Sequence, residues 1–190
     1  MTKQPRFIFS KTFIVLTAIT SLGISSFGIA QEANAGLEVK ANNDSPDLIA
    51  QNKDTSEQLV ATADNGTPEG LTEEVWLAAT GKVSVLEINP DSYTVMVEAS
   101  NLVPDGLYTL WWVNKKFIGM DMGPAGGLTA NEFRADSEGN ATTTINVPTN
   151  NNYQMLVAAY HGDDQTHGEM PGEMGQVTFG HLKGNFPAAN

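Results

Sequence analysis

Four methionines and two histidines lie in two loops rich in glycine and acidic residues. These side chains are Met120, Met122, His161, His167, Met170 and Met174. Thioether sulfur and imidazole nitrogen are ligands that suit copper, above all Cu(I). If the two loops meet within about 10 Å, as shared ligation of one ion requires, the residues predict a copper site. Copper is therefore the candidate cofactor.

Other interpretations of the same loops stay open. Methionines in irregular loops often cover adjacent apolar surface, and a histidine there is often merely polar. A calcium site would use the carboxylates of Asp121, Asp163, Asp164 and Glu169, although they lack the regular order of a calcium loop. A blue-copper centre and a copper–zinc dismutase are excluded, because the sequence has no cysteine and only three histidines.

Two histidines also have structural explanations. His161 ends an apolar run, and a histidine at a strand end commonly bonds a nearby carboxylate or carbonyl and fastens the following loop. His181 lies close to Lys183 on the last expected strand. We expect His181 at the surface or packed within a hairpin.

Three aromatic residues form a candidate interaction surface: Trp111, Trp112 and Tyr160. The adjacent tryptophans must point to opposite faces of a strand, so one enters the core and the other is exposed or covered by a loop such as 119–130. An exposed tryptophan would offer a flat platform for a sugar or a peptide.

No catalytic constellation is found in the sequence. A serine hydrolase would need a Gly-x-Ser-x-Gly elbow, which is missing, and cysteine catalysis is impossible without cysteine. The glycine-rich segment 123–127 lacks the following helix that a phosphate-binding loop uses. Carboxylates are too abundant for any one pair to be informative. We therefore predict a protein that is not an enzyme.

The elements that must position these side chains are strands. From residue 73 onward, runs of Val, Ile, Thr, Tyr and Trp alternate with Gly, Pro, Asn and Asp, which is typical of an all-β domain. The expected strands are 74–79, 82–88, 93–100, 107–114, 132–135, 141–147, 153–161 and 175–182. The prediction is a single antiparallel β-sandwich at 73–187, immunoglobulin-like or cupredoxin-like, with about eight strands and a tail at 188–190.

Two segments carry a family resemblance. Residues 99–111 (ASNLVPDGLYTLW) and 133–141 (FRADSEGNA) resemble two successive hairpins of extracytoplasmic sandwich domains, including the outer domain of some bacterial anti-sigma factors. The resemblance implies an exported β-sandwich of bacterial type and no particular chemistry. An anti-sigma role would also need a cytoplasmic helical domain, for which too few residues precede Phe13.

Residues 1–35 have the pattern of a signal peptide. Lys3, Arg6 and Lys11 form a basic start, and residues 12–31 carry no charge. Small residues at 33–35 favour cleavage before Gly36, and residues 28–30 offer a second cut. The alternative is an uncleaved signal that anchors the protein to the membrane. The predicted location is secreted or periplasmic, and the missing cysteine excludes lipidation and disulfides.

The cleaved chain would be strongly acidic. It would keep seven basic and 21 acidic residues, a net charge of −14. Such a field disfavours nucleic acid and anionic membrane surfaces, so we expect an unknown protein or small ligand as partner. The polar residues 36–72 predict a flexible acidic linker. Together these features predict an exported, non-catalytic binding or structural module, with copper binding as the alternative.

Overall fold

The computed structural model describes residues 56–189, which form an all-β domain. The elements are β1 (Ser56–Ala61), α1 (Glu73–Leu77), β2 (Thr80–Ile88), β3 (Ser92–Ser100), β4 (Leu107–Lys115), β5 (Met120–Pro124), β6 (Glu132–Arg134), β7 (Ala141–Pro148), β8 (Met155–His161) and β9 (Thr178–Asn185). Neighbouring strands pair in antiparallel fashion throughout the sheet. The predicted all-β class is confirmed.

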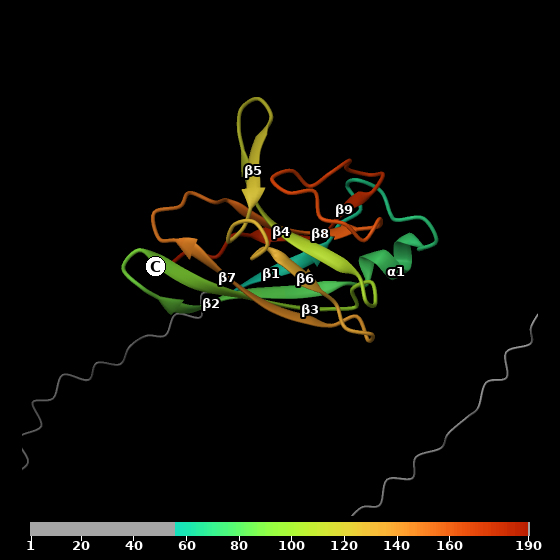
Figure 1. Cartoon of the computed structure of the whole chain (residues 1–190), viewed down its shortest axis with the longest axis horizontal. Coiled ribbons are helices and arrows are strands. Elements are labelled where there is room, and N and C mark those ends of the chain that lie inside the picture. The colour runs from blue at the N-terminus through green and yellow to red at the C-terminus, as the bar shows by residue number, and fades with distance from the viewer. Residues whose placement is uncertain (1–55, 190) are drawn as a thin grey trace, which may run out of the picture. The chain divides into compact units, whose positions relative to one another are not determined.

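One continuous sheet builds both layers of the domain. Its strand order is β5-β4-β8-β9-β1-β2-β3-β7, and β6 also pairs with β4. The sheet curls into a half-barrel, so that β4 and β8 face β2, β3 and β7 across the core (Figure 1). The two halves join where β1 pairs with β9, at Val60 with Lys183 and at Ala61 with Leu182. The finer assignment, immunoglobulin-like or cupredoxin-like, stays a prediction.

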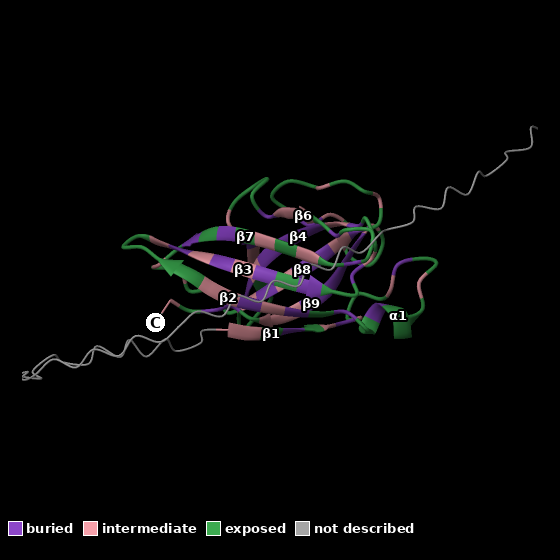
Figure 2. Ribbon diagram, turned by 90° about the horizontal axis from the view of Figure 1, so that it is seen from below, coloured by how far each residue is buried: buried purple, intermediate pink, exposed green. Residues whose placement is uncertain are grey.

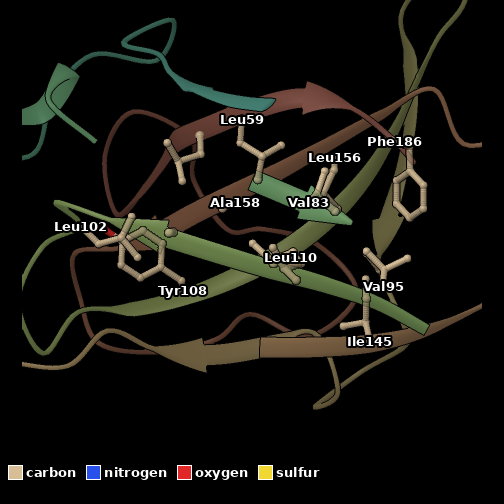
Figure 3. Packing of buried hydrophobic residues seen from close by; sticks show 14 of the residues in the cluster. Leu59, Val83, Val95, Leu102, Tyr108, Leu110, Ile145, Leu156, Ala158 and Phe186 are labelled. Carbon is tan, nitrogen blue, oxygen red and sulfur yellow. The ribbon is translucent and has the colours of Figure 1, made fainter. Parts of the chain in front are cut away.

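The core is filled by alternate residues of the strands. On β3, Val95 and Val97 are buried between more exposed neighbours, as the banding of that strand in Figure 2 shows. They pack with Ile145 of β7 against Leu110 of β4 and Leu156 of β8 (Figure 3). Each such side chain contributes about 1.5–3 kcal/mol when it is removed from water. This packing holds the two halves of the sheet against each other.

Residues 56–72 belong to the domain, so their assignment to a flexible linker is wrong. Strand β1 pairs with both β2 and β9, and its Leu59 lies in the core. A six-residue strand with one buried side chain and a polar sequence, SEQLVA, gives little hydrophobic signal. The rest of the predicted linker, 36–55, and the predicted signal peptide, 1–35, lie outside the described residues.

Two further segments differ from the sequence prediction. Residues 74–79 are largely helix α1, where the hydroxyl of Thr72 accepts a hydrogen bond from the Val75 N–H at 3.3 Å. Glu73 and Glu74 in the first turn suit the positive end of the helix dipole. Residues 120–124, within the predicted loop 119–130, form strand β5. The sequence does not indicate this strand, because Met-Asp-Met-Gly-Pro is short and lacks strand formers.

In the described residues, no helix reaches the length and hydropathy of a membrane span.

Candidate metal centre

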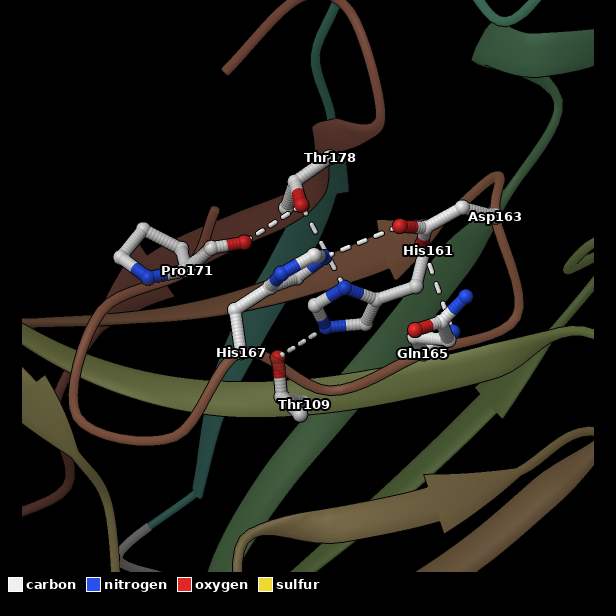
Figure 4. A network of polar contacts seen from close by, with 7 residues as sticks. All are labelled: Thr109, His161, Asp163, Gln165, His167, Pro171 and Thr178. Carbon is white, nitrogen blue, oxygen red and sulfur yellow. Dashed lines mark hydrogen bonds and ion pairs between the residues drawn. The ribbon is translucent and has the colours of Figure 1, made fainter. Parts of the chain in front are cut away.

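The outer face of β4, β8 and β9 carries the polar chemistry of the domain. Along β4, the residues that enter the core alternate with Thr109 and Trp111, which therefore point to the opposite face. Both are buried all the same, and so are His161 at the end of β8 and Thr178 at the start of β9. Residues of the β8–β9 connection, 162–177, lie over this end of the face (Figure 4).

Hydrogen bonds join these buried groups into one chain. The indole Nε1–H of Trp111 donates to Oγ1 of Thr109 at 2.7 Å, and that hydroxyl lies 2.7 Å from Nε2 of His161. On the other side of the ring, Nδ1 of His161 lies 3.3 Å from Oγ1 of Thr178. The Thr178 hydroxyl donates its own hydrogen to the carbonyl oxygen of Pro171. Every member of the chain therefore has a partner.

The chain determines which nitrogen of His161 carries the proton. Because Thr178 gives its hydrogen to Pro171, its oxygen can only accept one from Nδ1–H of His161. Nε2 is then the acceptor for the Thr109 hydroxyl. Burial lowers the pKa of His161, and nearby His167 lowers it further, against the opposing effect of carboxylates. His161 is thus neutral at physiological pH.

A second imidazole and a carboxylate lie beside His161. The rings of His161 and His167 are 5.7 Å apart, and Nε2 of His167 lies 3.1 Å from Oδ2 of Asp163. One ligand atom from each of these three residues lies within 4.8 Å of the other two. In Figure 4, Nε2 of His161 points towards Thr109, whereas Nδ1 lies on the side of His167 and Asp163. Nδ1 is therefore the nitrogen that faces the cluster.

Local backbone geometry positions the two loop residues. Oδ1 of Asp163 accepts a hydrogen bond from the Gln165 N–H at 3.3 Å, which leaves Oδ2 to face His167. The His167 ring rests against Gly172, where an added Cβ would lie 2.6 Å from the ring carbon Cδ2. Gly172 also has a φ of +89°, which other residues rarely adopt. The turn and the ring position therefore both require glycine there.

The donor set fits a borderline transition-metal ion such as Cu(II) or Zn(II). Ligand atoms about 2.1 Å from a tetrahedral ion lie about 3.4 Å from each other, close to the 3.1 Å between His167 and Asp163. Binding at Nδ1 would move the proton of His161 to Nε2, which would then donate to Thr109. Such a hydrogen bond on the far nitrogen is what commonly orients a metal-bound histidine.

Met120 and Met122 do not share one site with the histidines, so the predicted copper centre of six residues is wrong as a single site. In the register of β4, Met122 pairs with Val113, whereas His161 pairs with Leu107. Six residues of β4 separate these two positions, about 20 Å at 3.4 Å per residue. No methionine side chain spans that distance. Met120 and Met122 therefore lie towards the opposite end of the face from His161.

The methionine end of the face is a groove. It is lined by three of the predicted residues, Met120, Met122 and Met174, and by Met155 of β8. The fourth predicted methionine, Met170, is exposed and does not line the groove. Sequence reasoning missed Met155, because alternation within a strand does not tell which face a groove will occupy.

The carboxylates considered for calcium do not come together. Asp121 forms an ion pair with Lys116 on the β4–β5 hairpin. Asp164 pairs with Arg134 of β6, with 2.8 Å between Oδ1 and Nη1. Only Asp163 joins a cluster of potential ligands within the described part of the chain, and its partners are histidines. The calcium alternative is therefore wrong as a shared site.

The predicted aromatic surface is largely covered. Trp111 is 2% exposed and lies under the outer-face network, whereas Trp112 points to the core side and stacks on Tyr153 with ring centroids 4.8 Å apart. Tyr160 is half-buried. Among the described residues, the most exposed aromatic side chain is Phe117 at the tip of the β4–β5 hairpin.

His181 is buried, contrary to the expectation of a surface or hairpin position. Its ring stacks on Trp76 with centroids 3.5 Å apart. The Tyr108 hydroxyl accepts from the Val103 N–H at 3.0 Å and so donates to Nδ1 of His181 at 2.9 Å. Nε2–H of His181 then donates to the carbonyl oxygen of Trp76 at 2.8 Å. Burial lowers the pKa of His181 to about 4.

Comparison with known proteins found no family model and no curated protein that matches this chain. The similarity of residues 99–111 and 133–141 to anti-sigma-factor outer domains stays a prediction. Function must therefore be argued from the geometry of the sites themselves.

Proposed function

We propose that this protein is an exported, non-catalytic binding module that holds a divalent transition-metal ion, Cu(II) or Zn(II), through His161, Asp163 and His167. The observation that carries the proposal is the approach of three ligand atoms to within 4.8 Å of one another. The predicted signal peptide supports the exported location, where no thiol pool competes for the ion.

Each ligand has a distinct part in the proposed site. His161 is a fixed ligand, because its buried ring is held by Thr109 on one side. Asp163 and His167 are partly exposed and come from the same connection, so they can close on the ion with small side-chain movements. Three protein ligands leave a position for water or for a partner's side chain. This arrangement suits an ion that is received and passed on, as in carriage or sequestration.

Calorimetric titration of the purified protein with Cu(II) and Zn(II) tests the proposal. Asp163→Asn and His167→Ala should each weaken binding by about 100-fold or more, because each removes a ligand. Asp164→Asn is the matched control, since it removes the same charge from the neighbouring residue, which pairs with Arg134 instead. Equal affinity in all three variants, or no uptake by the unmodified protein, would overturn the proposal.

A pair of glycine substitutions tests the position of His167. Gly172→Ala should weaken metal binding by about 10-fold, because the new methyl group displaces the imidazole ring. Gly168→Ala is the control: its φ of +72° imposes comparable backbone strain, but among the described residues no atom lies within 4 Å of the added Cβ. If both variants weaken binding equally, loop strain rather than the ring contact is responsible.

A further inference from the structure

The methionine groove differs from the histidine cluster in shape and chemistry. It has a volume of about 310 Å³, within the lower range of small-molecule pockets. Its floor and walls are apolar and are contributed by Val113, Met120, Met122, Met155, Val157 and Met174. Methionine side chains are flexible and polarisable, so they adapt to ligands of variable shape.

The strand register places two of the methionines on either side of a valine. Met122 of β5 and Met155 of β8 both pair with Val113 of β4, one from each side. Their backbones are therefore two strand spacings apart, about 10 Å, with the valine side chain between them. The two methionines flank an apolar floor, and the groove volume is several times that of a coordinated ion, so the groove has room for a larger ligand.

The rim of the groove is positively charged in an otherwise acidic domain. Residues 56–189 contain five basic and 17 acidic residues, and two of the basic ones, Lys115 and Lys183, line this groove. Lys183 forms an ion pair with Asp64 and thereby lowers the pKa of that carboxyl group. Lys115 forms no ion pair with another described residue. Asp64 also lines the groove, and the charge of Lys115 contributes to the lowered pKa of this carboxyl group. The two lysines face this one carboxylate, so the groove has a net charge of about +1 at its edge.

We propose that the groove binds a small amphipathic molecule with an extended apolar body and an anionic head, of the class of a fatty acid. The apolar body would lie over Val113 and Val157 between the methionines. The head would meet Lys115 at the rim, where a charge-assisted hydrogen bond is available. Elsewhere the acidic surface repels such a ligand. This site is independent of the metal proposed at the other end of the face.

Titration of protein labelled with ¹³C at the methionine methyl groups tests the proposal. Decanoate should shift the signals of Met120, Met122, Met155 and Met174, and leave those of Met96 and Met170 unchanged. Decanol and decylammonium, which have the same chain but a neutral or positive head, should bind more weakly by about 10-fold or more, because they lose the charged contact with Lys115.

Two adjacent lysines provide a matched pair of variants. Lys115→Met should weaken decanoate binding by about 10-fold while it keeps the apolar stem. Lys116→Met should leave the affinity unchanged, because Lys116 pairs with Asp121 and does not line the groove. Gly180→Val places a branched side chain on the groove floor and should reduce the binding of both decanoate and decanol.

Three results would overturn the proposal. Decylammonium could bind as tightly as decanoate, or decanoate could leave the four methyl signals unshifted at millimolar concentration. Alternatively, Ag(I), used as a stable substitute for Cu(I), could shift those four signals while decanoate does not. That last result would assign the groove to a soft metal ion.

Discussion

The domain contains two buried histidines that resemble each other by every simple measure. His161 and His181 are each 1% exposed, and each has a pKa lowered mainly by burial. Both ring nitrogens of each residue lie within hydrogen-bonding distance of a partner. Burial and the mere presence of hydrogen-bond partners therefore do not separate a structural histidine from a candidate ligand.

The two histidines differ in the residues around them and in the lengths of their hydrogen bonds. His181 is enclosed by Trp76 and Tyr108, and both of its hydrogen bonds are 2.9 Å or shorter. His161 has a long, 3.3 Å contact at Nδ1, on the side where His167 and a carboxylate lie. Both ring nitrogens of His181 have short hydrogen bonds. His161 has one weak hydrogen bond, at Nδ1, which a metal ion could replace. The comparison predicts that changes at His181 affect stability and changes around His161 affect metal binding.

The largest expected effect is at the ring that covers His181. Trp76→Ala should lower the free energy of unfolding by about 4 kcal/mol, because it removes a fully buried ring and its hydrogen bond to the Thr62 carbonyl. Urea unfolding followed by circular dichroism measures the change. Val75→Ala, on the exposed side of α1, is the control. A similar loss in both variants would show that helix stability, not the stacked ring, is responsible.

The pH dependence of stability tests the environment of His181 directly. Its pKa is 6.5 when unfolded and about 4 in the folded protein, so the unfolded chain alone takes up a proton between these values. Stability should therefore fall as the pH drops, by about 2 kcal/mol from pH 7 to pH 5. Unfolding titrations of the unmodified protein and of His181→Gln measure this contribution by difference. Identical slopes of unfolding free energy against pH in the two proteins would contradict this expectation.

Loss of a single hydroxyl should have a smaller effect. Tyr108→Phe leaves the Val103 N–H and Nδ1 of His181 without their shared partner, which costs about 1.5 kcal/mol. The same unfolding experiment measures it. Tyr153→Phe removes a hydroxyl for which no hydrogen bond is present in the described structure, and it should change stability by less than about 0.5 kcal/mol. Equal losses would mean that the hydroxyl network is unimportant.

The smallest stability effect is expected beside His161. Thr178→Val removes the donor to the Pro171 carbonyl and the weak partner of Nδ1, at a cost of about 1 kcal/mol. Affinity for Cu(II) or Zn(II), measured by calorimetry, should not weaken, because Thr178 is not a proposed ligand. A loss of affinity as large as that of His167→Ala would place Thr178 within the site and remove the contrast between the two histidines.

Much of the fold follows from alternation in the sequence. Strands β3 and β7 are predicted well, because every second residue of β3 is apolar from Tyr93 to Ala99, and β7 repeats this alternation with one threonine, Thr143, among the apolar positions. Strand β1 has one buried residue, Leu59, and its place depends on pairing with β9, which is more than a hundred residues away. In α1, the apolar triplet around Trp76 resembles a strand, and the capping by Thr72 is the signal that identifies the helix.

Less of the candidate site follows from the sequence. His161 and His167 are recognisable by residue type, and the four-residue spacing of Asp163 and His167 is visible once a turn is assumed. The distance between the histidines and Met122 depends on the register of β4, which local patterns do not encode. Thr109 lies 52 residues from His161, and only the pairing of β4 with β8 brings them together.

The seam between β1 and β9 sets the order in which the domain can fold. Among the described residues, strand β1 is the first element and β9 the last, and their pairing joins the two halves of the sheet. Until synthesis reaches β9, the inner face of the nascent chain stays uncovered and the half-barrel cannot close. Pairing of such distant segments is intrinsically slow. A growing chain of this protein is therefore expected to lack the closed half-barrel, and to stay accessible to chaperones, until β9 has been made.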